Sequence, residues 1–223
     1  NWCNDAALCL AHGTAAEIDS TATEFVHAGP FFVLNLARGN PIITETNTLQ
    51  ADEEGEHYRP APIFRSVETW LTVAPGKRVD VTPHTTAAVR DRLLGVLFSQ
   101  SVDILDRGIG GAADLDLGCA LALGFRKGPL ELMRAMGEAE VRRVMDRFAA
   151  ERPGMPMPRR KLGDYLQFER HLLVDDVDGV KVITLRRPEA LNALHDELTE
   201  EILAVIRRHE GDPAVAGFVL TGY

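Results

Sequence analysis

Residues 124–137 read GFRKGPLELMRAMG, and residues 27–39 read HAGPFFVLNLARG. In both stretches a Gly-Pro pair precedes an apolar segment, and a basic residue stands close to a closing glycine. Proline is favoured at the first position of a helix, where its missing N–H would have no intrahelical partner. Glycine is typical of the position that follows the end of a helix. Each stretch therefore predicts a short helix that begins at its proline and ends at its last glycine.

The sequence around these two stretches repeats one order of features. Asp19 and Asp116 are 97 positions apart, the two Gly-Pro pairs are 99 apart, and Pro60-x-Pro62 and Pro156-x-Pro158 are 96 apart. A single Gly-Pro pair only marks a turn, but matching features at a nearly constant offset are typical of a duplication. The sequence therefore predicts two copies of one helical scaffold in the first 160 residues.

Helical periodicity supports this prediction in the second copy. From Val89 to Arg107 the apolar residues recur at spacings of three and four, which predicts one buried stripe on an amphipathic helix: Leu93, Leu94, Leu97, Phe98, Val102 and Leu105. A short helix is expected at about 112–122, another from Pro129 to Gly137, and a last one to about Ala150.

The residues after about 165 have a different pattern. Two apolar runs flank Asp178-Gly179, a pair typical of a tight hairpin turn. A helix is expected from about Asn192 to His209, followed by the fully apolar strand AVAGFVLTG at 214–222. Its inward residues should be Leu194, Leu198, Ile202 and Ile206. This order predicts a ββαβ unit with one parallel pair of strands, whose two faces cannot both be covered within the segment.

Composition excludes several classes of protein. The chain has 223 residues, a net charge of −9, 45% hydrophobic residues and three cysteines. The negative charge disfavours nucleic-acid binding, and no apolar run is long enough to predict a membrane span. An odd, small number of cysteines favours reduced thiols and a cytoplasmic location. Because the sequence begins with Asn1 and ends in an apolar strand, we expect it to be a segment of a longer protein.

Three patterns that resemble binding sites are better explained by structure. Gly108-x-Gly110-x-x-Ala113 matches a loose dinucleotide fingerprint, but a helix precedes it where that motif needs a strand, so a turn between helices is favoured. Cys3, Cys9 and His12 lack a fourth partner for a metal. The other histidines accompany no recognisable nucleophile. We therefore predict no catalytic residue and no metal ligand.

The order of features in residues 1–160 resembles the C-terminal domain of 3-hydroxyacyl-CoA dehydrogenases, present in tandem as in multifunctional fatty acid oxidation enzymes. Asp91-Arg92-Leu93-Leu94 is similar to the Asn-Arg-Leu start of a helix in that family, where the Asn is catalytic in the functional copy. Asp91 in place of Asn implies that the second copy is not catalytic. The corresponding position of the first copy would precede Asn1.

Residues 180–223 resemble the opening of the crotonase, or enoyl-CoA hydratase/isomerase, family, with its RPxxLNAL turn and its VLTG strand. The resemblance implies that the turn borders the CoA site, which nominates Arg187, Ala190 and Leu191 as cofactor neighbours; a purely structural turn remains an equal alternative. The family's oxyanion-binding N–H groups and its glutamates would follow Tyr223.

The sequence thus predicts a mainly α chain with three parts: a first helical copy at 1–75, a second at 76–160, and a truncated α/β crotonase-like ββαβ unit at 161–223. The resemblance implies a segment of a bifunctional enzyme that uses NAD and CoA thioesters, with neither cofactor held tightly by this chain. Acyl-CoA and a second copy of the chain, in a dimer, are the expected partners.

Two other functions stay open at this point. The helical part could be a homodimerisation module unrelated to CoA, or a helical extension that only docks a crotonase domain. Acyl-CoA binding distinguishes the first of these from a β-oxidation segment.

Overall fold

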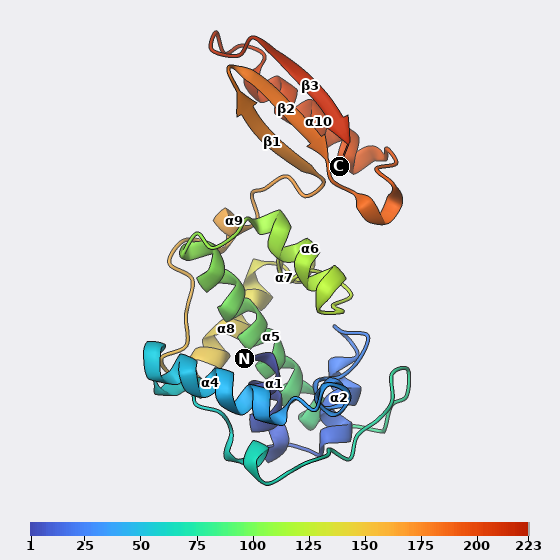
Figure 1. Ribbon diagram of the computed structural model, residues 1–223, viewed down its shortest axis with the longest axis vertical. Helices are drawn as coiled ribbons and strands as arrows, with labels where there is room; N and C mark the ends of the chain where they lie inside the picture. Colours follow the sequence, from blue (N-terminus) through green and yellow to red (C-terminus); the bar gives the residue numbers. More distant parts are fainter. Residues whose placement is uncertain (223) are drawn as a thin grey trace. The chain divides into compact units, whose positions relative to one another are not determined.

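The computed structural model describes residues 1–222 and contains two compact units, Asn1–Leu166 and a second that begins at Gln167 (Figure 1). The sequence placed the start of the last part at residue 161. The short helix α9 (Leu162–Tyr165), which follows that position, lies in the first compact unit, and the start of the last part at 161 stays a prediction. The further division of the first unit at 75/76 stays a prediction.

The first half of the helical unit follows the predicted order of helices. The Gly-Pro pair at 29–30 opens a helix at its proline, as the sequence predicted, and the acidic segment before Gly55 ends a longer helix. These helices are α1 (Trp2–Leu8), α2 (Ala15–Ala22), α3 (Pro30–Ala37) and α4 (Asn40–Glu54), with short 3-10 turns at Cys9–Ala11, Glu56–Tyr58 and Pro62–Arg65.

The second half repeats this sequence of elements. Its first helix begins at Pro83, six residues before the predicted Val89, because Thr82 caps the N–H of Thr85 and Pro83 stands at the first helical position. The turn around Gly108 joins two helices, as predicted. The elements are α5 (Pro83–Asp106), α6 (Ala112–Ala122), α7 (Pro129–Met136) and α8 (Glu138–Glu151).

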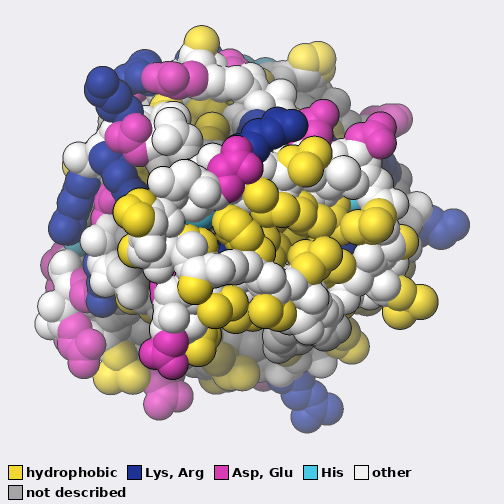
Figure 2. All heavy atoms as spheres, turned by 90° about the horizontal axis from the view of Figure 1, so that it is seen from above, with side chains coloured by type: hydrophobic (Ala, Val, Ile, Leu, Met, Phe, Trp, Pro, Cys, Tyr) yellow, Lys and Arg dark blue, Asp and Glu magenta, His cyan; other side chains and the backbone are white. Residues whose placement is uncertain are grey.

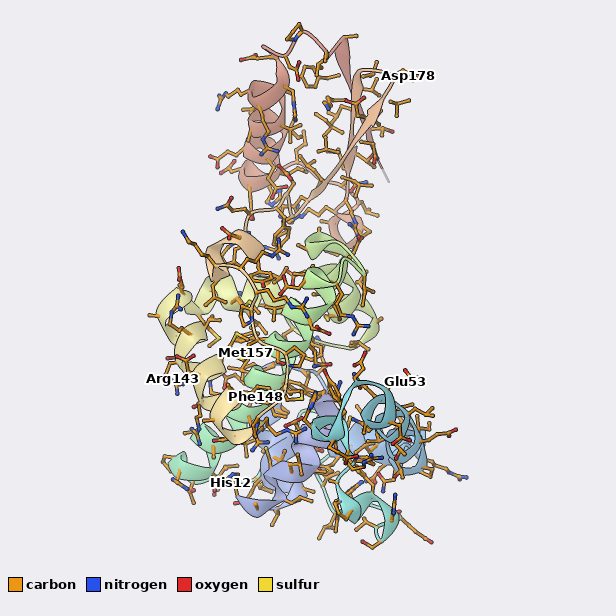
Figure 3. All side chains as sticks on the ribbon, turned by 90° about the vertical axis from the view of Figure 1, so that its left-hand side faces the viewer. His12, Glu53, Arg143, Phe148, Met157 and Asp178 are labelled. Atoms are coloured by element: carbon orange, nitrogen blue, oxygen red, sulfur yellow. The ribbon has the colours of Figure 1, made fainter. Side chains whose placement is uncertain are left out.

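Helix α5 forms the centre of the helical unit, with α1, α2, α7 and α8 packed against it (Figure 1). It approaches α8 most closely at Gly95, where an added Cβ would lie 2.5 Å from Phe148 Cβ. Phe148 is 1% exposed and belongs to a core cluster with Tyr58, Val96 and Met155. Figure 3 labels Phe148 on the same helix as Arg143, which lies at the outside of the unit. The contact between Gly95 and Phe148 therefore sets how closely the two long helices can pack.

The two halves meet at equivalent positions. Val26 and Phe125 form an isolated antiparallel bridge, and the N–H of His27 donates to the carbonyl of Gly124 at 3.0 Å. Val26 and Phe125 are 99 positions apart, the same offset that separates the two Gly-Pro pairs. A contact between the same position of two copies is what an approximate twofold axis produces.

The second unit is a three-stranded sheet with one helix. Strand β1 (Leu172–Val177) pairs antiparallel with β2 (Val180–Leu185), and β2 pairs parallel with β3 (Gly217–Gly222). Asp178 and Gly179 form the hairpin turn with φ of 52° and 79°, which confirms the predicted turn. The predicted ββαβ order is correct.

Helix α10 (Asp196–His209) covers one face of this sheet (Figure 1). Leu198 and Val205 of the helix pack against Leu172 and Ile183 of the strands. The helix starts four residues after the predicted Asn192, because residues 188–192 form a 3-10 turn and two left-handed residues instead. Leu194 therefore lies outside the helix and is exposed, so its predicted inward position is wrong.

Apolar side chains remain exposed in the second unit. Val219 and Leu220 of β3 are 47% and 55% exposed, and Val177 at the end of β1 is also exposed. Figure 2 shows hydrophobic side chains gathered in the middle of the face that it draws. The incomplete cover that the sequence predicted for the strands is therefore found at β3.

Candidate functional site

A buried carboxylate holds the start of α3. Asp19, on α2, accepts a hydrogen bond from the N–H of Phe31 at 2.9 Å and from the N–H of Phe32 at 2.8 Å. These N–H groups belong to the first turn of the helix, where no intrahelical carbonyl can accept them. The carboxylate thus accepts hydrogen bonds from two N–H groups that would otherwise be unpaired. Its negative charge also interacts favourably with the positive, N-terminal end of the helix dipole.

Asp116 does the same for α7 in the second half. Its carboxylate accepts from the N–H of Leu130 at 2.7 Å and from the N–H of Glu131 at 3.0 Å. Asp116 lies on α6, the equivalent of α2. We call these two arrangements the carboxylate clamps.

The clamps explain why glycine precedes each proline. A Cβ added to Gly29 would lie 2.3 Å from Asp19 Cγ, and one added to Gly128 would lie 2.3 Å from Asp116 Cγ. Both glycines have negative φ, −67° and −64°, which any residue can adopt. The glycines are therefore required for space beside the carboxylate, and not for an unusual backbone angle.

The first clamp has an additional donor. The hydroxyl of Thr72 donates to Asp19 Oδ2, so that this carboxylate accepts three hydrogen bonds. Burial nevertheless raises the pKa of Asp19, because the loss of hydration outweighs the hydrogen bonds from Thr72, Phe31 and Phe32. The clamp therefore stabilises the start of the helix, although the buried carboxylate loses its hydration.

Asp91, at the position that the resemblance associates with a catalytic Asn, lies in an ion-pair network. It is buried, and Arg143 donates to both of its oxygens at 2.8 Å. Arg147 donates to Oδ2, also at 2.8 Å. Both oxygens of the Asp91 carboxylate thus accept charge-assisted hydrogen bonds from arginines of α8.

The network continues to the other half of the helical unit. Arg147 also pairs with Glu151 at 2.8 Å, and Arg92 joins Glu151 at 3.0 Å to the fully buried Asp5 at 3.1 Å. The line of charges from Asp91 through Arg147, Glu151 and Arg92 to Asp5 therefore ties α5 and α8 to α1.

Asp91→Asn is expected to lower the free energy of unfolding by about 1 to 2 kcal/mol at neutral pH, because half-exposed arginines lose a charged partner. Burial raises the pKa of Asp91, but the hydrogen bonds from Arg143 and Arg147 lower it more, and the net shift is downward. A lowered folded pKa stabilises the fold above the ordinary carboxyl pKa of about 4, and this stabilisation is lost as the pH falls through the folded value. Urea unfolding of both proteins at several pH values should therefore show a difference that shrinks toward acid pH. An equal difference at every pH would contradict this role.

The turn at residues 187–193 brings the nominated CoA neighbours together. The N–H of Arg187 donates to Asn192 Oδ1 at 2.7 Å, and its guanidinium donates to the carbonyl of Ala193 at 3.0 Å. Arg187 also lies 3.4 Å from Glu189. Its side chain therefore closes the turn that Ala190 and Leu191 belong to.

Leu191 stands out in this turn. It has a left-handed backbone, with φ of 50°, and its side chain is 92% exposed. A bulky residue in this conformation is strained by about 1 to 2 kcal/mol, and strained residues occur preferentially at binding sites. The turn therefore presents an exposed apolar side chain that a ligand can contact.

The basic residues around 160 line an open pocket of 520 Å³ together with Met145 and Met157. Arg160 pairs with Asp106 at 3.2 Å and lies 4.3 Å above the ring of Tyr165. Arg160 thus serves the packing of the helical unit.

The cysteines are unsuited to nucleophilic chemistry. Burial raises the pKa of Cys3 and of Cys119 to about 11 and that of Cys9 to about 12. All three are free thiols. They stay protonated at neutral pH.

The structure also brings together three residues that the sequence analysis had passed over. His171, His195 and Glu197 place their side-chain ligand atoms within 4.8 Å of one another. His171 and His195 are 24 positions apart, and this spacing does not belong to a known metal-binding motif. The cluster is therefore visible only where the start of β1 packs against the start of α10.

Two family models match the chain in succession. Residues 89–172 match the 3-hydroxyacyl-CoA dehydrogenase C-terminal domain, and residues 175–223 match enoyl-CoA hydratase/isomerase. Two consecutive segments of the chain thus match these two families. The dehydrogenase segment includes Asp91 and the second carboxylate clamp, and the hydratase segment includes the turn with Arg187 and Leu191.

A curated relative supports the hydratase segment. The protein named "Probable enoyl-CoA hydratase echA8" from Mycobacterium leprae is 41% identical over 51 residues, which are 23% of this chain and 20% of the relative. The match thus spans about a fifth of the length of that relative. No solved structure matched the chain. Within residues 1–222, the search for a helix long and apolar enough to cross a bilayer found none.

Proposed function

We propose that this chain is a segment of a bifunctional 3-hydroxyacyl-CoA dehydrogenase and enoyl-CoA hydratase that acts on acyl-CoA thioesters in fatty acid oxidation. The succession of the two family matches along one chain carries this proposal. Consecutive steps of thioester oxidation need a hydratase and a dehydrogenase, and fusion places both on one molecule. NAD and the CoA thioester are the cofactor and substrate of the proposed parent enzyme.

Within that enzyme, residues 1–160 serve as a helical scaffold of two copies and have no catalytic role of their own. The repeated carboxylate clamps and the bridge between Val26 and Phe125 support a duplication. The pairing of Asp91 with two arginines supports a non-catalytic second copy. The division into copies at 1–75 and 76–160, with the crotonase-like part from 161, is part of this proposal.

The turn formed by Arg187, Ala190 and Leu191 borders the CoA of the hydratase segment. The exposed, strained Leu191 supports this assignment, since its side chain has an apolar surface free to meet the ligand. Arg187 contributes by fixing the turn, and its pairing with Glu189 leaves it little freedom to bind a phosphate.

The purified chain is expected to show no turnover above buffer with acetoacetyl-CoA and NADH, or with crotonyl-CoA and water. The dehydrogenase reaction needs a bound nucleotide and a base, and hydration needs N–H donors aimed at the enolate oxygen. The described residues hold Asp91 in ion pairs and offer no such set. Turnover in either assay would contradict the proposed silent scaffold.

A titration with acyl-CoA separates this proposal from a homodimerisation module unrelated to CoA. Binding to the folded state raises the melting temperature, so a rise is expected here and none for the module. Light scattering on the same samples tests the proposed dimer, and cell fractionation tests the proposed cytoplasmic location.

A further inference from the structure

Two histidines and a carboxylate converge where β1 begins and α10 begins. His171 directly precedes β1, His195 is the residue before the first turn of α10, and Glu197 lies in that turn. Glu197 Oε2 lies 3.5 Å from His171 Nε2 and 3.9 Å from His195 Nε2. The two imidazole rings stand edge to face with centroids 5.0 Å apart.

Both rings present buried nitrogen atoms without hydrogen bonds among the described residues. These atoms are His171 Nε2, which faces Glu197, and His195 Nδ1; the His195 nitrogen that faces Glu197 is the other one, Nε2. The side chain of His171 is 9% exposed, while Glu197 is 51% exposed. A buried polar atom without a partner costs about 1 to 3 kcal/mol and calls for an explanation.

We propose that His171, His195 and Glu197 bind one divalent zinc ion. Imidazole nitrogen and carboxylate oxygen suit zinc, and two histidines with one glutamate form a recurrent three-ligand set that leaves the fourth position for water. This inference concerns the local structure of residues 167–222 and is independent of the proposed function. It replaces the prediction that the chain has no metal ligand.

The separations between the ligand atoms fit such an ion. Tetrahedral ligands at about 2.0 to 2.1 Å from zinc are about 3.3 to 3.4 Å from one another. The observed separations of 3.5 and 3.9 Å from Glu197 exceed this spacing slightly. The ligand atoms of all three residues lie within 4.8 Å of one another, so the two imidazole rings and the exposed Glu197 side chain have to move slightly closer to hold the ion.

A second carboxylate fixes the buried ligand in place. Glu201, one turn after Glu197 on α10, accepts the N–H of His171 at 2.9 Å and that of Arg170 at 3.0 Å. The carbonyl of His171 accepts the N–H of Arg186 at 2.7 Å. Glu201 is thus a positioning residue, and its charge offsets the unfavourable effect of the helix N-terminus on a cation.

The ion would connect the start of the sheet to the start of the helix. Both elements belong to a small unit with exposed apolar residues, and small units depend on such links for stability. Binding of the ion is therefore proposed to stabilise this unit.

The test uses the whole 223-residue chain, freed of metal by a chelator and titrated with Zn²⁺ against a chromophoric competitor. One tight equivalent of zinc per chain is expected, with a rise in melting temperature at saturation. Replacement of zinc by Co²⁺ should give the strong visible absorption of a tetrahedral site.

His195→Asn and Glu197→Gln are the informative variants. Asparagine is a favoured residue before a helix, so His195→Asn keeps α10 while it removes a ligand. Each variant should weaken zinc binding at least about 100-fold, since loss of an outer-shell partner alone costs about 10- to 100-fold. His209→Asn, at the other end of α10, is the matched control and should bind zinc as the wild type does.

Circular dichroism of each variant verifies that it is folded. Absence of a tight equivalent in the wild type, or binding unchanged by both His195→Asn and Glu197→Gln, overturns the proposal. Zinc that persists in these variants would be held elsewhere.

Discussion

Phe148→Ala is expected to lower the free energy of unfolding of the helical unit by about 4 kcal/mol. Phe148 is 1% exposed and packs with Tyr58, Val96 and Met155. A Cβ on Gly95 would lie only 2.5 Å from Phe148 Cβ, so the backbones of α5 and α8 are already in close contact. They cannot move closer to fill the cavity, and most of it would remain.

Urea unfolding followed by far-UV circular dichroism measures this loss. Leu36→Ala is the control, since Leu36 is also a large apolar residue of a helix but is 77% exposed. The control should change the free energy of unfolding by less than about 0.5 kcal/mol. A loss below about 1.5 kcal/mol for Phe148→Ala would mean that the helices can collapse around the cavity.

Asp116→Ala is expected to destabilise the same unit by about 2 to 4 kcal/mol, because the N–H groups of Leu130 and Glu131 lose their acceptor. Asp19→Ala should have an effect of similar size, since Phe31 and Phe32 lose theirs. Both effects can be measured by the urea dependence of the helical signal.

Two further variants check the cause of the loss. Asp146→Ala removes an exposed carboxylate from α8 and should have almost no effect. Gly128→Ala disrupts the same clamp without removing the carboxylate, because the added methyl group would collide with Asp116. If Gly128→Ala is neutral while Asp116→Ala destabilises, the glycine is not required for space as we infer.

Much of the helical unit could be predicted from local signals. Proline at 30 and 129 marks the first residue of α3 and α7, and the spacing of apolar residues after Val89 identifies α5. These signals act within a few residues, so the sequence displays them directly.

The purpose of the Gly-Pro pairs could not be predicted in this way. The carboxylate that requires each glycine is 10 positions away for Gly29 and 12 for Gly128, on another helix. The arginines that hold Asp91 likewise come from α8, and no periodicity indicates that they point to it. Contacts of this kind follow from the packing of helices.

In the second unit the order of elements was predictable and the turn was not. Leu194 fits the spacing of four between the apolar residues of α10. The 3-10 turn after Arg187, however, makes the helix begin only at Asp196, so Leu194 lies outside it and is exposed. The left-handed backbone of Leu191 also has no local signal, since leucine rarely adopts it. The residues that sequence reasoning missed are thus those whose role depends on a turn or a strand pairing.

Two features of the chain bear on the proposed function. Residues 89–172, which match the dehydrogenase C-terminal domain, include Asp91 in its ion-pair network, and residues 175–223, which match enoyl-CoA hydratase/isomerase, include the exposed Leu191. Both features support the scaffold proposed above.

The equivalence of the two clamps is tested most directly by amide hydrogen exchange, measured by nuclear magnetic resonance on the whole chain. The N–H groups of Phe31 and Leu130 should both be protected, although neither has a carbonyl partner within its own helix. Asp19→Ala should release Phe31, and Asp116→Ala should release Leu130, because alanine offers no acceptor. Free exchange of either amide in the wild type would contradict the existence of one clamp built twice.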